Sequence, residues 1–127
     1  MLIDTCIWIE IFCNSQKGKN ALAMMKGETN SASILTIAEI AEWCSRSGKD
    51  PARHVKSIGL SAKILPLDVE NAMAAGKLRN SLRPARKGIG MVYCLIYSSA
   101  IRAGTELLTD DAHLKGLPLA VSMEEPA

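Results

Sequence analysis

Short apolar runs alternate with longer segments of helical spacing along the whole chain. The apolar runs predict buried strands over Met1–Ile3, Ala32–Leu35, Lys63–Leu67, Glu106–Thr109 and Leu119–Val121. Apolar positions three or four residues apart predict helices over Cys6–Phe12, Lys17–Lys26, Thr36–Arg46, 51–58, Val69–Leu82 and Gly90–Ala103. Parallel strands need crossover connections of about a dozen residues or more. The alternation therefore predicts an α/β fold, a three-layer sandwich with a central, mostly parallel sheet covered on both faces.

Capping residues predict where some of these helices begin and end. Thr36 and Glu39 have the S/T-x-x-E spacing of a capping box, in which each side chain bonds the other residue's backbone N–H. Asp50 followed by Pro51 predicts the start of another helix, and Gly59 its end.

The composition is that of an ordinary globular domain. The chain has 127 residues, of which 48% are hydrophobic and 22% charged. A chain of this length buries enough surface to fold without disulfides, so one domain over residues 1–127 is expected. The 15 Lys and Arg against 13 Asp and Glu leave a net charge of only +2. Any nucleic-acid partner must therefore be met by a local basic patch.

No membrane partner is expected. The longest uncharged stretch, 88–101, is shorter than the roughly 20 residues of a spanning helix. The N-terminus has an acid at Asp4 and no leading basic segment, which predicts no signal peptide and a cytoplasmic protein. The cysteines have no C-x-x-C spacing, which argues against a zinc site and predicts reduced, mostly buried thiols: Cys6, Cys13, Cys44 and Cys94.

Acidic residues follow three of the predicted strands. Asp4 comes directly after the first strand, Glu39 lies one turn into the helix after the second, and Asp110 and Asp111 follow Glu106–Thr109. Ligands of open parallel sheets bind at the carboxyl ends of the strands, so these acids are expected at one edge. Clustered carboxylates repel unless a cation neutralises them, and their hard oxygens suit Mg²⁺ or Mn²⁺. The pattern indicates phosphodiester chemistry.

Each acid also has a purely structural interpretation. Asp4 can cap the helix that follows it, Glu39 is explained by the capping box with Thr36, and Asp111 can be a turn residue. Spacing alone leaves both interpretations open.

Several motifs, in order along nearly the whole chain, resemble those of VapC-like PIN domains. Met1–Glu10 (MLIDTCIWIE) resembles the family's opening strand with its Asp-Thr pair, and Leu35–Ile40 (LTIAEI) its second acidic motif. Gly76–Arg79 (GKLR) and the segment from Leu82 onward resemble the middle blocks, and Glu106–Leu114 (ELLTDDAHL) the closing strand with T-x-D.

The resemblance implies a metal-dependent endoribonuclease, commonly the toxin of a toxin–antitoxin pair. It implies that Asp4, Glu39 and Asp111 are the catalytic, metal-binding acids, and it predicts RNA, an antitoxin and a second copy of the chain as partners. Three neighbouring residues would support the acids: Thr5, Thr109 and Asp110. The apolar surplus around Trp8 to Phe12 independently suggests a partner surface on the first helices, although core packing also accounts for Trp8 and Trp43.

One acid of the family pattern is missing. Where the family has G-x-x-x-A-D-x-x-I, this chain has Tyr93 at the acid position. A tyrosine, with an ordinary pKa of about 10, is neutral at pH 7 and takes one charge and one hard ligand from the site. An alternative to a weakened nuclease is therefore a catalytically silent PIN-like module that binds RNA or a protein. A doubly wound phosphate-binding or signalling domain is a weaker third interpretation, because no Gly-rich loop follows a strand.

The one basic concentration of the chain lies between Lys77 and Lys87. The candidates for RNA phosphate contacts are Arg79, Arg83, Arg86 and Lys87, and the arginines are favoured because they grip a phosphate with two parallel hydrogen bonds. A solvated helix face explains the same charges, and both interpretations stand.

Overall fold

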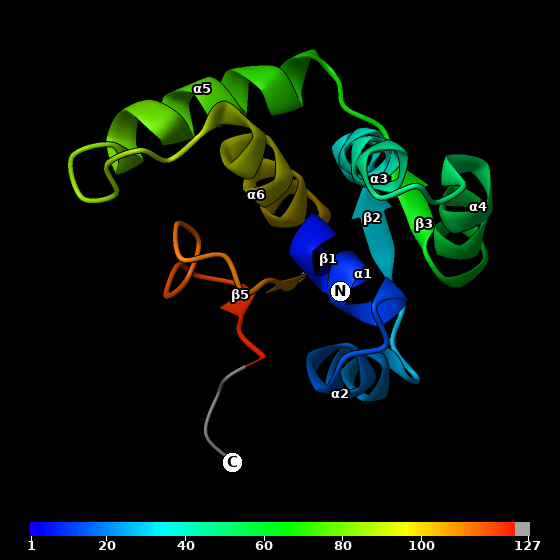
Figure 1. Ribbon diagram of the computed structural model, residues 1–127. Coiled ribbons are helices and arrows are strands. Elements are labelled where there is room, and N and C mark those ends of the chain that lie inside the picture. The colour runs from blue at the N-terminus through cyan, green and yellow to red at the C-terminus, as the bar shows by residue number, and fades with distance from the viewer. Residues whose placement is uncertain (124–127) are drawn as a thin grey trace.

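A five-stranded sheet lies at the centre of the protein, in a computed structural model that describes residues 1–123 (Figure 1). Its strands are β1 (Leu2–Ile3), β2 (Ser31–Ser33), β3 (Lys63–Leu65), β4 (Leu107–Leu108) and β5 (Ala120–Val121). They lie in the order β3-β2-β1-β4-β5, and every pairing is parallel. The predicted α/β class and sheet are confirmed.

Helices cover both faces of this sheet. They are α1 (Thr5–Phe12), α2 (Gln16–Met25), α3 (Ile34–Arg46), α4 (Pro51–Ser61), α5 (Val69–Leu82) and α6 (Met91–Ala103). Successive strand residues point to opposite faces. Ile3 and Leu108 accordingly pack with α1 to α4, whereas Leu2 and Leu107 pack with α5 and α6. These two cores make the predicted three layers, and Figure 1 shows α5 and α6 apart from α2 and α4.

The strand order places a switch in direction at the middle of the sheet. The chain starts at β1, adds β2 and β3 on one side, and then crosses over to add β4 and β5 on the other. Leu2 pairs with Leu107 and Ile3 with Leu108, so β1 and β4 end side by side. The residues that follow these two strands are therefore neighbours at the carboxyl edge, where open α/β sheets bind ligands.

The start of α3 differs from the prediction, and the capping box is wrong. The strand expected over Ala32–Leu35 ends at Ser33, whose side chain accepts from the N–H of Leu35 and caps α3. Because the helix begins two residues earlier than expected, Thr36 lies inside its first turn. The Glu39 carboxylate is then free to accept a hydrogen bond from another element.

Other element ends are shifted by a few residues. Gly59 does not end α4, which continues to Ser61, and the predicted strand over Lys63–Leu67 is cut short at Leu65 before Pro66. The strand expected from Leu119 starts at Ala120, because Leu119 has a positive φ of 72°.

Further expectations concern the cysteines and the two tryptophans. All four cysteines are free, but Cys13 is exposed and only Cys44 and Cys94 are buried. Trp8 is buried in the core, whereas Trp43 is half-buried beside it. Within residues 1–123, no helix is long and apolar enough to span a membrane.

Candidate functional site

Asp4 lies directly after β1 and is almost completely buried. It is the N-cap of α1, because its Oδ1 accepts from the N–H of Thr5 at 2.8 Å. Its Oδ2 accepts from the Thr109 hydroxyl, after β4, at 2.7 Å. Burial raises the pKa of Asp4 above its ordinary value; the two hydrogen bonds oppose that rise, and the charges of Glu39 and Asp111 add to it. A buried carboxylate with few compensating partners favours binding of a proton or a cation.

Glu39 is brought to the same edge by Thr5. The Thr5 hydroxyl donates to Glu39 Oε1 at 2.7 Å, and the hydroxyl oxygen of the fully buried Thr36 lies 2.9 Å from that of Thr5. Thr5 begins α1, whereas Thr36 and Glu39 both belong to α3. This hydrogen-bonded chain therefore joins the segments after β1 and β2.

Asp111 is oriented by its own loop. Its backbone N–H donates to the Thr109 hydroxyl oxygen at 3.1 Å, and that same hydroxyl binds Asp4. Its Oδ1 accepts from the His113 backbone N–H at 2.8 Å and lies 3.0 Å from His113 Nδ1. Thr109 therefore joins Asp4 and Asp111, and His113 holds one carboxylate oxygen of Asp111.

Tyr93 lies in the first turn of α6, on the same cavity as the acids. Its ring stacks on that of His113, with centroids 5.3 Å apart and planes at 25°. Burial raises its pKa to about 12, helped by hydrogen bonding to Asp111 and by the charges of Asp111, Asp4 and Glu39. The phenol is therefore neutral at pH 7 and adds no charge to the acids around it.

These residues surround one cavity at the carboxyl edge of the sheet. Its volume is about 180 Å³, and its lining consists of Asp4, Thr5, Cys6, Ile9, Glu39, Tyr93 and Asp111. The structure thus brings together the three predicted acids and the residue at the missing fourth position. Among residues 1–123, however, no three acids, histidines or cysteines lie close enough together to hold a single metal ion between them.

Asp110 does not line this cavity. Its Oδ2 lies 3.0 Å from Lys17 Nζ on α2, and its Oδ1 accepts from the backbone N–H of Met123. Asp111 lines the cavity, whereas Asp110 ties the loop to α2.

The predicted basic residues divide into two kinds. Arg79 Nε donates to the carbonyl of Ile89 at 3.1 Å, and Arg86 Nη1 donates to the carbonyls of His113 and Lys115. Arg83 and Lys87 are exposed in the segment between α5 and α6. The first two anchor this segment, and the other two extend from it toward solvent.

Sequence reasoning missed three residues at the site: Cys6, Ile9 and His113. The Cys6 thiol lies 3.7 Å from Asp4 Oδ2, and burial together with the charge of Asp4 raises its pKa to about 12. His113 follows Asp111 by two residues, a spacing at which an aspartate accepts from a later backbone N–H. That Asp-x-His spacing was the one sequence signal that could have identified a missed residue. Whether Ile9 lines the cavity depends on how α1 is oriented.

The fold and this acidic edge define an α/β domain with carboxylates at the switch point of its sheet. The sequence matches the family description "PIN domain" over residues 1–118, and the chain therefore belongs to the PIN domain family. No curated protein matches the sequence.

Solved structures share the whole fold at low sequence identity. A chain of a toxin–antitoxin complex from Klebsiella pneumoniae superimposes with a TM-score of 0.83 at 21% identity, over 98% of both chains. A chain of VapBC2 from Rickettsia felis, bound to a DNA fragment from their promoter, gives 0.76 at 23% identity over 95% of both chains. A chain of DNA-bound VapBC from Salmonella typhimurium gives 0.72 at 18% identity over 96% of both.

Proposed function

We propose that this protein is a Mg²⁺- or Mn²⁺-dependent endoribonuclease of a toxin–antitoxin pair, weakened by the tyrosine at position 93. The observation that carries the proposal is the convergence of Asp4, Glu39 and Asp111 on one cavity. These acids are far apart in sequence, and three different strands bring them to it. Burying Asp4 beside the negative charges of Glu39 and Asp111 is costly, and a site that binds a cation explains the arrangement.

The donor set fits a hard divalent cation. Mg²⁺ is usually held by one or two carboxylates, with several waters and substrate phosphates as its other ligands. Three acids in direct contact with one ion are therefore unnecessary. Asp4 and Asp111, joined through Thr109, are the residues we assign to hold it, and Glu39 lines the same cavity. When bound, the ion would activate water and stabilise negative charge on the scissile phosphate.

The chain's own residues prepare the cavity for this chemistry. Thr109 fixes the Asp4 and Asp111 segments relative to each other, and Thr5 holds Glu39 through one carboxylate oxygen, Oε1. Ile9 gives the cavity an apolar wall, which reduces competition from bulk water. Tyr93 occupies the position of a fourth acid with a neutral ring, and this reduces the attraction for the cation.

The proposed partners are a protein antitoxin and a second copy of the chain. We also propose that residues 1–127 form one domain and that the protein is cytoplasmic. One structure that shares the fold is described as a toxin–antitoxin complex, and two others as VapBC2 and VapBC bound to DNA. Aromatic rings of α1 and α3 support a protein partner: Phe12 is half-buried and stacks at 6.2 Å from Trp8 and 6.3 Å from Trp43.

A catalytically silent module is the second candidate, and two observations favour it. Tyr93 removes one carboxylate from the cavity, and the acids within residues 1–123 are too far apart for three to ligate one ion. Such a protein would keep the fold and its partner surfaces without cleaving RNA.

Cleavage of single-stranded RNA by the full chain, with Mn²⁺ or with EDTA, separates the two candidates. We expect slow, divalent-dependent cleavage that Glu39→Gln abolishes. Glu42→Gln is the matched control, because Glu42 lies on the same helix with its side chain 74% exposed and pairs with Arg46. If neither the wild-type chain nor Tyr93→Asp cleaves RNA in Mn²⁺, the nuclease proposal is wrong and the silent module is supported.

A further inference from the structure

The cavity has an aromatic border that the acids do not account for. Tyr93 and His113 stack at 5.3 Å, and the His113 side chain remains 38% exposed. Tyr93 covers one face of the imidazole, and the exposed part of the ring is left for a ligand. Flat exposed rings bind unpaired nucleobases by stacking, with little dependence on which base is present.

The basic segment between α5 and α6 packs against this pair of rings. Arg86 Nη1 donates to the carbonyls of His113, at 3.2 Å, and Lys115, at 2.9 Å. A Cβ on Gly88 would lie 3.8 Å from His113 Nε2, and one on Gly90 would lie 3.6 Å from the Tyr93 ring. Lys87 lies between Arg86 and Gly88, two residues next to the His113 turn, and its side chain is exposed.

Arg86 holds the basic segment against the turn that contains His113. Its guanidinium binds backbone carbonyls, whose positions do not depend on side-chain type, and this fixes the segment on the 113–115 turn. Figure 1 shows this segment, at the end of α5, on the same side of the molecule as the chain between β4 and β5. In this arrangement Arg83 and Lys87 stay exposed to solvent.

We propose that the stacked rings of Tyr93 and His113, together with the exposed cations Arg83 and Lys87 of the segment that Arg86 fixes to the His113 turn, form a subsite for one unpaired nucleotide of single-stranded RNA. The base stacks on His113, and its phosphate lies against the two cations. Stacking platforms flanked by basic residues are the usual means of binding single strands. The choice of RNA rests on the proposed function, whereas the subsite itself needs no metal ion.

Binding measured in EDTA tests the subsite separately from cleavage. The probe is a short fluorescent oligouridine, followed by anisotropy with the full chain. We expect His113→Ala to weaken binding about tenfold, the effect of losing one stacked base, and His113→Phe to restore it. An abasic probe of the same length should bind the wild-type chain about tenfold more weakly and should no longer distinguish His113→Ala from wild type.

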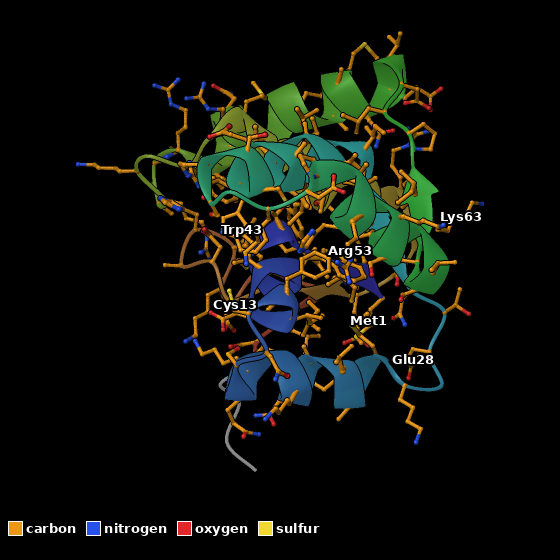
Figure 2. The ribbon with its side chains drawn as sticks, turned by 45° about the vertical axis from the view of Figure 1, so that its right-hand side comes forward. Met1, Cys13, Glu28, Trp43, Arg53 and Lys63 are labelled. Atoms are coloured by element: carbon orange, nitrogen blue, oxygen red, sulfur yellow. The ribbon has the colours of Figure 1, made fainter. Side chains whose placement is uncertain are left out.

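Charge variants test the phosphate contacts. The plot of log affinity against log salt has a negative slope. Arg83→Gln with Lys87→Gln should make that slope shallower by about 1.4, which corresponds to two contacts on a single strand. Arg53→Gln with Lys56→Gln is the matched control: it removes the same two charges from α4, on the other face of the sheet (Figure 2), and should leave the slope unchanged.

Two results would overturn the subsite: equal affinity of the wild-type chain for the abasic and base-bearing probes, or an unchanged salt slope in the Arg83 and Lys87 variant. The first comparison uses only the wild-type chain and stays decisive even if His113→Ala fails to fold. A chain that discriminates these probes in EDTA but never cleaves RNA would refute the nuclease and leave the subsite standing.

Discussion

Replacing Tyr93 by Asp should destabilise the metal-free protein and make it respond to divalent cations. The ring stack with His113 is lost, at a cost of about 1 kcal/mol. A new carboxylate beside Asp111 adds repulsion of about 1 kcal/mol at 4 Å in water and about 4 kcal/mol near a protein surface. An acid in the first turn of α6 recovers about 0.5 kcal/mol from the helix dipole. The net loss is about 1.5 to 4.5 kcal/mol, or a melting temperature lowered by roughly 5 to 20 °C.

A divalent cation should restore much of the stability that Tyr93→Asp loses. The added charge attracts a divalent cation, and the missing ring leaves room for its bound water. If Mn²⁺ is present at a hundred times its Kd, it stabilises the folded chain by about 2.7 kcal/mol, which offsets most of the loss. The wild-type chain, with its neutral phenol, should gain much less at the same concentration.

Thermal unfolding in EDTA and in Mn²⁺, for wild type and three variants, measures both effects. Tyr93→Asn removes the ring without adding charge, and Tyr93→Phe keeps the ring without the hydroxyl. Only Tyr93→Asp should combine a lower melting temperature in EDTA with a large rise in Mn²⁺. An equal rise for Tyr93→Asn would show that space rather than charge limits binding, and a large rise for wild type would show that three acids suffice.

Two further predictions concern the acids and their supports. Burial raises the Asp4 pKa, so protonation of Asp4 contributes stability below its ordinary pKa of 3.8 and that contribution is lost as pH rises through the higher folded value. In EDTA, urea unfolding against pH should show wild type losing stability relative to Asp4→Asn over this range; parallel curves would contradict it. Thr5→Val should cost about 1 to 3 kcal/mol in urea unfolding, because it leaves the buried Thr36 hydroxyl and Glu39 with fewer partners, whereas Thr5→Ser should cost much less. Equal losses for the two would show that the methyl group matters more than the hydroxyl.

The positions of Asp4 and Asp111 could be predicted from sequence because they depend on strand ends. In a parallel sheet, every strand delivers the next residue to the same edge, and short apolar runs locate the strands. The structure adds that β1 and β4 are adjacent, which lets Thr109 reach Asp4. Adjacency is a property of strand order, which no local pattern contains.

Glu39 shows where local reasoning failed. The capping box accounted for it within four residues of sequence, and that interpretation competed directly with a role in the site. The helix instead takes Ser33 as its cap, since the strand before it ends earlier. The true partner of Glu39 is Thr5, on an element that only the folded sheet brings near.

The local pattern did not distinguish Asp110 from Asp111, which only the family resemblance singled out, and it did not distinguish the arginines of the basic segment from one another. Which of two adjacent acids meets the cavity depends on Lys17 from α2 and on the chain after β5. Arg86 differs from Arg83 in that backbone carbonyls of a distant turn accept its hydrogen bonds. Side-chain direction at these positions is set by tertiary contacts and leaves no trace in hydrophobic periodicity.

Tyr93 couples the two proposals with opposite sign. Its ring supports His113 in the proposed nucleotide subsite, and the same ring stands where a fourth carboxylate would strengthen cation binding. An acid at this position therefore improves the site for the cation and removes half of the stacked pair. A chain that keeps the tyrosine binds the metal ion more weakly and an unpaired base more strongly. Slow cleavage combined with metal-independent binding of single strands is the behaviour that this trade predicts.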